Sequence, residues 1–327
     1  FEQNLQAIAA SFQSAKIPLY LSNIVSNEKD QPPFSSVSSP EVKKLLDREK
    51  PRSNRRIIQQ GQDLLSSGNQ SADLAFTVAQ AMLAEDDRRA VDYFQMARDY
   101  DLLRFRAPTS FNAIIEEVVE NNGSALFVDS EKYIREDTND GLIGSAQMLE
   151  HLHPTPRAYF LIAEAFYQSL LNNEQYFQHA DTNSNTRVHI SIEQAWRNMP
   201  LSEVDELVGD YKIETLMSDY PFSSSKKLVP APKNSTDVEK LAKRRIEGEP
   251  WLTGQPSLLV TLQKQNNINE AAKSAALFPV KGSQGLLAVP KSTSMNRSYT
   301  SRSALPPPYF EKIPIAEYFH ACSSRAD

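Results

Sequence analysis

The seven residues Met148-Leu149-Glu150-His151-Leu152-His153-Pro154 contain one carboxylate and two imidazoles, and Pro154 is expected to start the helix predicted over about 156–172. Glu150 and His153 are three positions apart, so their side chains can meet in a turn leading into that helix. A carboxylate held against an imidazole fixes the tautomer of the ring and stabilises the imidazolium, as a general base in acyl transfer requires. A polar loop without chemistry has the same Glu-x-x-His spacing. The spacing alone leaves both interpretations open.

The composition indicates a soluble globular protein. The chain has 327 residues, of which 40% are hydrophobic and 23% are charged, so it is long enough to bury a sizeable core. Its net charge of −6 and its pI near 5.5 argue against a nucleic-acid partner, which requires a basic face. No apolar run approaches the roughly 18 residues of a membrane-spanning helix. We therefore predict neither nucleic-acid binding nor a membrane span.

The sequence shows no signature of a metal site or a bound cofactor. No cluster of cysteine and histidine has zinc spacing, and no glycine-rich phosphate loop is present, so we predict neither group. Cys322 is the single cysteine, which excludes a disulfide within the chain and leaves the redox compartment open. The first residues, Phe1-Glu2-Gln3-Asn4, have neither an initiator methionine nor the pattern of a signal peptide. We expect the sequence to be a piece of a longer protein, and its localisation stays open.

Two units of helix followed by strand predict an α/β fold. Residues 2–15 have the apolar period of a helix, and 16–25 form a short, largely apolar strand. A second unit has its helix near 111–119 and its strand at 125–129. Helix followed by buried strand is the repeating step of an α/β sheet. Residues 1–172 are therefore predicted to form one α/β domain.

The long stretch between the two units is predicted to be a helical insertion over about 40–100. Its helices are expected at 42–49, 54–66, 72–84 and 88–99. Some apolar residues fall where a tetratricopeptide repeat has its packing positions, namely Leu74, Ala90, Phe94 and Ala97. Alanine at helical spacing is also ordinary core. We therefore predict an insertion that resembles one such repeat.

The C-terminal part of the chain is predicted to be helical with long connections. Residues 173–222 form a helical extension, with one helix that opens at Ser202 on a capping-box pattern with Asp205. Residues 223–280 are predicted to be a linker rich in serine and proline, followed by a helix and a repeat-like helical hairpin. Residues 281–327 are predicted to be poorly ordered.

Three separated blocks of sequence occur together with this order of elements. They are Pro18-Leu19-Tyr20-Leu21-Ser22-Asn23-Ile24-Val25-Ser26-Asn27-Glu28-Lys29-Asp30 with Pro33-Phe34, Ala97-Arg98-Asp99-Tyr100-Asp101-Leu102-Leu103-Arg104-Phe105-Arg106-Ala107, and Glu150-His151-Leu152-His153-Pro154. Over about residues 1–222 the chain resembles the C-terminal half of an SGNH (GDSL-type) hydrolase, of the bacterial type that carries tetratricopeptide repeats. The family's last block is Asp-x-x-His, so Glu150 stands where most members have aspartate. The resemblance implies a partial flavodoxin-like sheet.

The same resemblance implies roles for the Glu-x-x-His pair. His153 would be the general base that takes a proton from a serine hydroxyl, and Glu150 would orient it. The family's nucleophilic serine and the glycine and asparagine of its oxyanion hole belong to blocks that would precede Phe1. This chain alone is therefore expected to be inactive, because the nucleophile forms the covalent intermediate. The implied parent is an esterase or acyl transferase for a small ester or O-acylated substrate, and a membrane-anchored or extracytoplasmic parent is compatible with it.

Two histidines compete for the role of base. His151 lies inside the same block as His153, but it lacks the spacing to Glu150. The other histidines stand alone in the sequence and are interpreted as ordinary surface or core residues; they are His179, His189 and His320. The base is therefore assigned to His153, with His151 as the alternative.

Three further residues are candidates for substrate binding, each with a structural alternative. Ser26 and Asn27 follow the first strand, and in open α/β sheets ligands bind at such strand ends. Equally, the two residues can cap the loop that follows. Arg106 can grip an anionic group through two hydrogen bonds. It can instead form a structural ion pair with Asp99 or Asp101.

A second functional hypothesis belongs to another class. In it the α/β part is non-catalytic and the helical repeats bind a protein partner. The repeat-like helices at 72–99 and 255–278 support this hypothesis, although stacked repeats generally need about three units for stability. Replacing His153 with alanine would separate the two hypotheses, because a hydrolase would lose activity and a scaffold would keep its partner.

Overall fold

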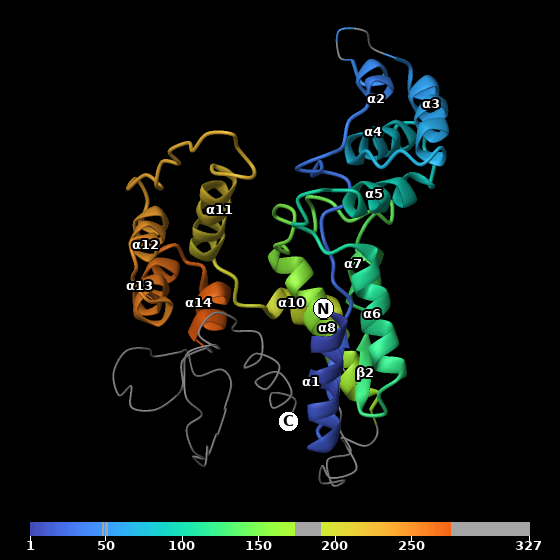
Figure 1. Ribbon diagram of the computed structural model, residues 1–327. Coiled ribbons are helices and arrows are strands. Elements are labelled where there is room, and N and C mark those ends of the chain that lie inside the picture. Colours follow the sequence, from blue (N-terminus) through green and yellow to red (C-terminus); the bar gives the residue numbers. More distant parts are fainter. Residues whose placement is uncertain (48, 50–51, 174–190, 276–327) are drawn as a thin grey trace. The chain divides into compact units, whose positions relative to one another are not determined.

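The computed structural model describes residues 1–47, 49, 52–173 and 191–275. This part of the chain is mostly helical and contains a small parallel sheet of two strands (Figure 1). It divides into two compact units, Phe1–Ser184 with Thr215–Lys227 and Asn185–Glu214 with Leu228–Asp327. Several predictions fall outside the described residues: the tail at 281–327, most of the polar stretch after 173, and the residues His179, His189, His320 and Cys322.

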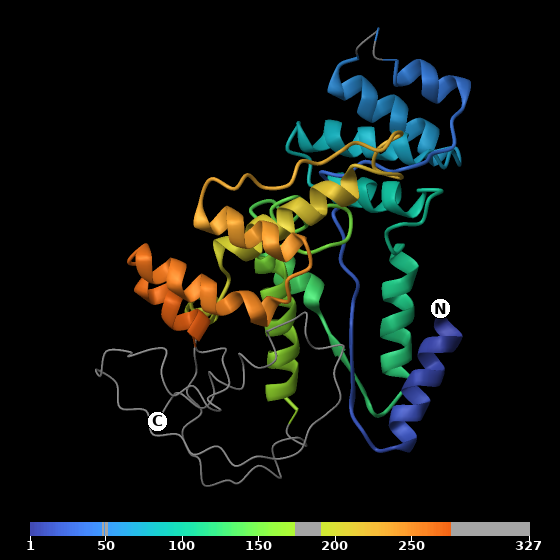
Figure 2. The same ribbon diagram turned by 90° about the vertical axis from the view of Figure 1, so that its left-hand side faces the viewer.

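The sheet in the first unit joins the two predicted helix–strand units. Strand β1, Leu19–Ser22, pairs in parallel with β2, Ala125–Val128, so that Leu19 lies opposite Ala125. The helices that precede the strands, α1 (Glu2–Ser14) and α6 (Thr109–Glu120), contact each other and lie side by side in Figure 2. An arrangement that combines helices with a parallel sheet is therefore confirmed. The described residues add no further strand, and a larger flavodoxin-like sheet stays a prediction.

A short helix that the sequence did not predict follows β2. This helix, α7, spans Ser130–Glu136, and Asp129 caps it by accepting the backbone N–H of Lys132 at 3.1 Å. A loop then leads to α8, Pro156–Leu171, which is the predicted helix after the Glu-x-x-His stretch. Helix α8 contacts both α7 and β2 through its buried apolar face. The Glu-x-x-His stretch therefore lies in the connection between two helices that contact each other, of which α8 also contacts β2.

The predicted insertion is helical. It contains α2 (Pro40–Leu45), α3 (Asn54–Ser66), α4 (Ala72–Leu83) and α5 (Ala90–Asp99), which are grouped together in Figure 1. The predicted packing residues all lie in its apolar core: Leu74, Ala90, Phe94 and Ala97. Gly61 lets α3 approach α4 closely, because a Cβ there would overlap the side chain of Val78. The helices are confirmed, and their assignment to a tetratricopeptide repeat stays a prediction.

The second unit is a separate set of helices with its own apolar core. It contains α10 (Ile192–Asn198), most of α11 (Glu203–Met217), α12 (Asp237–Ile246), α13 (Trp251–Lys264) and α14 (Ile268–Ala275). The predicted capping box at the start of α11 is present, because the hydroxyl of Ser202 accepts the N–H of Asp205 while the Asp205 carboxylate accepts the N–H of Ser202. Buried valine and leucine side chains of α11, α12 and α13 form the core.

Candidate active site

The Glu-x-x-His stretch forms a narrow loop that closes just before α8. Met148 and Pro154 form an isolated antiparallel bridge across the loop. The side chain of Thr155 then caps α8 by accepting the N–H of Ala158 at 3.3 Å. The helix begins at Pro156, so the prediction that Pro154 starts it is wrong. Pro154 instead takes part in the bridge, and the cap residue lies between it and the helix.

The side chains of Glu150 and His153 meet, as predicted. Nδ1 of His153 donates a hydrogen bond to Oε1 of Glu150, and the same oxygen accepts the backbone N–H groups of His153 at 2.7 Å and Leu152 at 3.1 Å. An ionised carboxylate can only accept hydrogen bonds, so the ring proton lies on Nδ1 and the lone pair on Nε2. A histidine that acts as a general base through Nε2 requires this tautomer.

The two partners differ in their exposure to solvent. The side chain of Glu150 is 0% exposed, whereas that of His153 is 51% exposed. A carboxylate inside the protein acts on its partner with less screening than one in water. The arrangement therefore combines a dry carboxylate that orients the ring with an imidazole that a bound molecule can reach.

The charge of Glu150 is maintained by its hydrogen bonds. Burial opposes ionisation of this carboxyl group, but the hydrogen bonds from the His153 amide, the His153 ring and the Leu152 amide together hold the pKa of Glu150 below its ordinary value. The phenol of Tyr159 on α8 has a raised pKa, because it is partly buried and because the negative charge of Glu150 disfavours its ionisation. Glu150 is therefore ionised, and Tyr159 protonated, at neutral pH.

His151 faces the protein interior. Its side chain is 2% exposed, and its Nε2–H donates to the carbonyl of Pro32 at 3.1 Å. Its ring stacks on Phe34 with centroids 4.1 Å apart, while Phe105 and Phe222 contact it edge-on. The imidazole is thus the buried member of an aromatic cluster whose three phenylalanines are half-buried.

The surroundings of His151 keep it neutral. Burial and, to a smaller extent, the nearby positive charge of Arg106 together lower the pKa of His151 to about 4. A neutral, enclosed imidazole cannot take a proton from a substrate that approaches from solvent. Of the two histidines considered for the role of base, His153 is therefore the one placed to act.

Ser26 and Asn27 are buried in the loop that follows β1, with exposed fractions of 3% and 0%. The Oδ1 of Asn27 accepts the N–H of Asp30 at 3.0 Å, which is the loop-capping role considered from the sequence. The backbone N–H of Asn27 donates to the carbonyl of His151 at 3.0 Å. The loop after β1 is therefore hydrogen-bonded to the Glu-x-x-His loop. A contact of Ser26 or Asn27 with substrate stays a prediction.

Arg106 is also buried, with an exposed fraction of 3%. Its Nη1 donates to the carbonyls of Asn27 at 2.8 Å and Gln31 at 3.1 Å, and its Nη2 lies 3.8 Å from a carboxylate oxygen of Asp101. Burial lowers the pKa of Arg106 to about 10, and the charge of Asp101 opposes that shift. The structural ion pair considered from the sequence is present. The role of Arg106 in substrate binding stays a prediction.

A buried ion pair ties the loop after β1 to α7. The carboxylate of Glu28 is 1% exposed and accepts two hydrogen bonds from Arg135, at 2.6 and 2.9 Å. Arg135 also donates to the carbonyl of Gly141, in the connection between α7 and the Glu-x-x-His loop, at 2.7 Å. Further along, Gly144 lies so close to the side chains of Asp30 and Lys29 that a Cβ there would require both of them to shift. The two loops behind Glu150 are therefore fixed to each other at several points.

Sequence reasoning missed most of the residues that surround the pair. Phe34 and Phe105 lie inside the quoted blocks, but no periodic pattern indicates that they would enclose an imidazole. Phe222 comes from a segment that was predicted to end a helical extension, far along the chain from His151. The ion pair of Glu28 with Arg135 spans 107 positions. A single sequence carries no record of such long-range contacts. Co-variation among homologous sequences is the signal that could reveal them.

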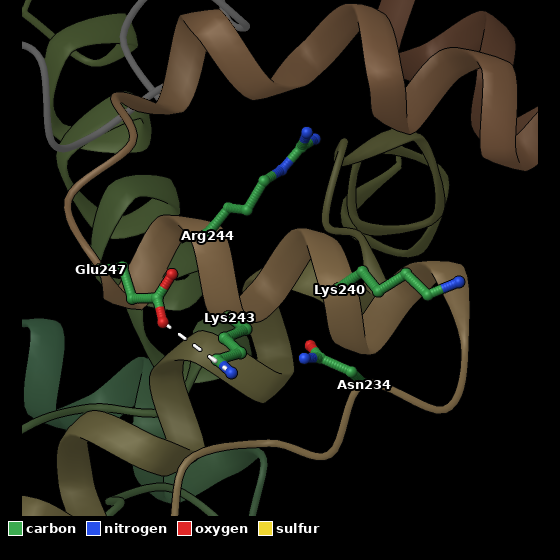
Figure 3. Close-up of a pocket in the computed structure, with 5 residues that line it drawn as sticks. All are labelled: Asn234, Lys240, Lys243, Arg244 and Glu247. Atoms are coloured by element: carbon green, nitrogen blue, oxygen red, sulfur yellow. Dashed lines mark ion pairs between the residues drawn. The ribbon is translucent and has the colours of Figure 1, made fainter.

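Three cations of α12 lie around one hollow of the surface. Lys240, Lys243 and Arg244 line a surface hollow together with Asn234 and Glu247, and Figure 3 shows the three basic side chains pointing in different directions. Each has an acidic partner, since Lys240 lies 3.0 Å from Asp237, Lys243 lies 3.9 Å from Glu247 and Arg244 lies 3.3 Å from Glu249. The hollow therefore offers no converging positive charge to an anion.

No match to a known protein identifies the chain. Comparison with family models, with curated proteins and with solved structures finds no match in any of the three. Within residues 1–47, 49, 52–173 and 191–275, no helix has the length and apolar character needed to cross a membrane, and no three metal-binding side chains are grouped together. The geometry of the Glu150–His153 pair is therefore the observation on which a function can be argued.

Proposed function

We propose that the chain is part of an SGNH-type serine hydrolase, an esterase or acyl transferase in which His153 is the general base and Glu150 orients it. The main support for this proposal is the contact of a buried carboxylate with Nδ1 of a half-exposed imidazole, because this contact leaves Nε2 available as a base. The positions of the two residues in a loop directly before α8 support this proposal, because the family that the sequence resembles has its Asp-x-x-His block at the start of its final helix.

The proposed chemistry is acyl transfer through a serine. Nε2 of His153 takes the proton of a serine hydroxyl while the oxygen attacks the carbonyl carbon of an ester or O-acyl group. The ring becomes an imidazolium, which the charge of Glu150 stabilises, and then gives its proton to the departing alkoxide. Water or another acceptor releases the acyl group by the same steps. Glu150 itself keeps its negative charge throughout.

The serine would come from a part of the parent protein that this sequence does not contain. In the described part of the chain, no hydroxyl is hydrogen-bonded to Nε2 of His153. The three blocks of the resemblance place the nucleophile and the oxyanion hole ahead of Phe1, and a flavodoxin-like sheet would extend the two strands seen here. The chain by itself is therefore proposed to be inactive.

The test measures hydrolysis of a small acetyl ester by three proteins: this chain, a version extended at its N-terminus by the parent sequence, and the extended version with His153→Ala. We expect activity in the extended protein only, and we expect His153→Ala to lower kcat/KM by about 10⁴-fold, because the base and the nucleophile act as a unit. Glu150→Gln should lower kcat/KM to a similar extent, about 10⁴-fold, because the amide no longer fixes the tautomer of the His153 ring.

A matched control makes the same chemical change elsewhere. His179→Ala also replaces a histidine with alanine, and the extended protein carrying it should keep its activity. A folded, extended protein that hydrolyses no acetyl or longer acyl ester would contradict the hydrolase. If it instead binds a protein partner with equal affinity before and after His153→Ala, the chain acts as a helical interaction scaffold. The apolar core shared by α2 to α5 is the observation that favours this second function.

A further inference from the structure

Buried polar atoms that lack a hydrogen-bond partner among the described residues are concentrated behind the Glu150–His153 pair. They are Ser26 Oγ, Asn27 Nδ2, Arg106 Nε and Nη2, Glu150 Oε2 and His151 Nδ1. A buried polar group without a hydrogen-bond partner destabilises the folded protein. Such groups are rare in native proteins and usually indicate an ordered water or an ion. Several of them in one small region therefore require a common explanation.

Two of these atoms are acceptors that lie close together. The carbonyl of Pro32 can only accept, so Nε2 of His151 carries the ring proton and Nδ1 has a lone pair. Nδ1 of His151 lies 4.0 Å from Oε2 of Glu150, which also only accepts. Two acceptors at this separation cannot bond to each other. A donor of two protons is needed between them.

The remaining atoms supply donors. Nε and Nη2 of Arg106 carry N–H groups that have no hydrogen-bond partner in the described part of the chain, although Nη2 lies 3.8 Å from a carboxylate oxygen of Asp101. Asn27 connects the guanidinium to the His151 segment, because its carbonyl accepts from Arg106 and its N–H donates to the carbonyl of His151. Arg106 is held in place from the other side, because its Nη1 donates to the carbonyls of Asn27 and Gln31. The free donors of Arg106 and the free acceptors of Glu150 and His151 thus complement each other, without a direct bond between them.

One water molecule can satisfy three of the six atoms, namely Nδ1 of His151, Oε2 of Glu150 and one N–H group of Arg106. A water about 2.8 Å from each acceptor can bridge two atoms 4.0 Å apart, donating one proton to each, and its oxygen can accept from a guanidinium N–H. We propose that an internal water links Arg106 to Nδ1 of His151 and Oε2 of Glu150, and that Arg106 is thereby a positioning residue for the Glu150–His153 pair. The water site rests on the contacts of Arg106, His151 and Glu150, whereas the positioning role of Arg106 also rests on the proposed function.

The consequence for the pair is a carboxylate held at both oxygens. Oε1 of Glu150 receives its bonds from His153 and Leu152, while the water fixes Oε2. Rotation of the carboxylate about its last bond would exchange the two oxygens and break the contact with His153. The water and Arg106 oppose that rotation. The base is then held in the Nδ1–H tautomer.

The first experiment uses the unsubstituted chain. The protein is produced with isotope-labelled histidine, and the signals of the five histidines are assigned by single replacements with glutamine. Magnetisation transfer from water to the ring proton of His151 that lies between its two nitrogens is then measured by NMR. We expect a signal with the sign of a long-lived bound water. A folded protein without this signal overturns the water site, whatever its activity on esters.

The second experiment replaces Arg106 and compares it with an exposed arginine two positions away. Arg106→Met should remove the water signal at His151, raise the pKa of His151 and lower the fraction of His153 in the Nδ1–H tautomer. Arg104→Met changes the same side chain at an exposed position and should leave all three readouts unchanged. Arg106→Lys keeps a cation that can donate to the water, so it should restore the water signal and most of the tautomer.

The water site and the positioning role of Arg106 can fail separately. A water signal that persists in Arg106→Met, with an unchanged His153 tautomer, overturns the positioning role of Arg106. If Arg106→Met does not fold, Arg106→Lys decides, because a folded lysine variant with no water signal contradicts a link that needs only a cationic donor. None of these readouts uses ester turnover. An extended protein that is inert towards esters therefore removes the hydrolase and leaves the water site standing.

Discussion

The helices α2 to α5 and the Glu-x-x-His loop belong to the same unit, but different interactions stabilise them. In the helices, apolar side chains that recur at helical spacing form the core, and the hydroxyl of Ser71 caps α4 three residues away. Around the loop, buried charges and amides bond across long stretches of chain, as Glu28 and Arg135 do across 107 positions. Stability in the helices is spread over many small contacts. Around the site it depends on a few polar contacts, each costly to lose.

The largest effect of a single replacement around the site should come from the buried ion pair. Arg135→Met leaves the 1% exposed carboxylate of Glu28 without its partner, so we expect the free energy of unfolding of the first unit to fall by about 3–5 kcal/mol. Urea unfolding followed by backbone NMR signals of this unit measures the loss. Fluorescence of Trp196 and Trp251, which both lie in the second unit, reports separately on the other helices.

A double replacement distinguishes a buried charge from lost packing. Glu28→Gln combined with Arg135→Met removes both charges, and we expect it to recover about 1–3 kcal/mol relative to Arg135→Met alone, because neighbouring residues are not additive. Phe94→Ala in the helices is the matched core truncation, expected to cost about 3–5 kcal/mol with no such recovery by a second change. Equal losses in the single and double variants would show that Arg135 contributes packing and not charge.

The second effect is a pH dependence of the free energy of unfolding. We expect it to arise from the residues around the Glu-x-x-His loop and not from the helices α2 to α5. The pKa of His151 is about 4 in the folded protein and near 6.5 in the unfolded chain, so the unfolded chain takes up the proton first as the pH falls. The stability that the folded protein owes to neutral His151 is therefore fully present above pH 6.5. It is lost as the pH falls from 6.5 to 4, and the loss is about 3 kcal/mol at most. The charged groups that face His151 are Arg106, Glu150 and Asp101.

The control for this pH dependence is His151→Phe, which keeps a ring in the aromatic cluster and removes its titration. Its stability should change by less than that of the unsubstituted protein between pH 6.5 and 4. Glu150 also has a lowered pKa, but its contribution is lost only as the pH falls below about its ordinary value of 4.5. Parallel stability curves for the two proteins across this window would show that His151 is not held neutral by its surroundings.

The same contrast explains which parts of the fold the sequence could predict. The bounds of α3, α4, α6 and α8 follow from apolar periods, and α4 and α8 also have capping side chains; both signals act over three or four positions. Helix α7 was missed because it is short and its capping residue, Asp129, follows directly on a strand. Pro154 was assigned to a helix start because proline favours that position, but Thr155 and Pro156 provide the better pair of cap and first residue.

The candidate site was predicted in its local part and missed in its long-range part. Glu150 and His153 are three positions apart, so spacing alone could bring them together. That His151 would be enclosed by Phe34 and Phe222 depends on tertiary packing, which a single sequence does not record. For the same reason Arg106 carried two interpretations until its burial beside Asp101 and the loop after β1 was visible.

The smallest effect compares two helix caps, one in each region. Ser71 caps α4 and Thr155 caps α8, each with a side-chain oxygen that accepts a backbone N–H at 3.2 or 3.3 Å. Replacing either residue with alanine should cost about 1 kcal/mol of unfolding free energy. Ser71 is fully buried and also shares a hydrogen bond with Ser36 at 3.0 Å, whereas the second hydrogen bond of Thr155, to the carbonyl of Ala146, is longer at 3.4 Å, so the loss at Ser71 should be the larger of the two.

The two caps should differ in what else they change. Thr155 lies two residues after His153 and ends the bridge-closed loop, so Thr155→Ala should lower the fraction of His153 in the Nδ1–H tautomer and, in the extended protein, lower kcat with little change in KM. Ser71→Ala, with equal or greater loss of stability, should leave both unchanged. If both variants alter His153 to the same extent, the loop responds to the stability of the whole unit, and the division into two independently stabilised regions is wrong.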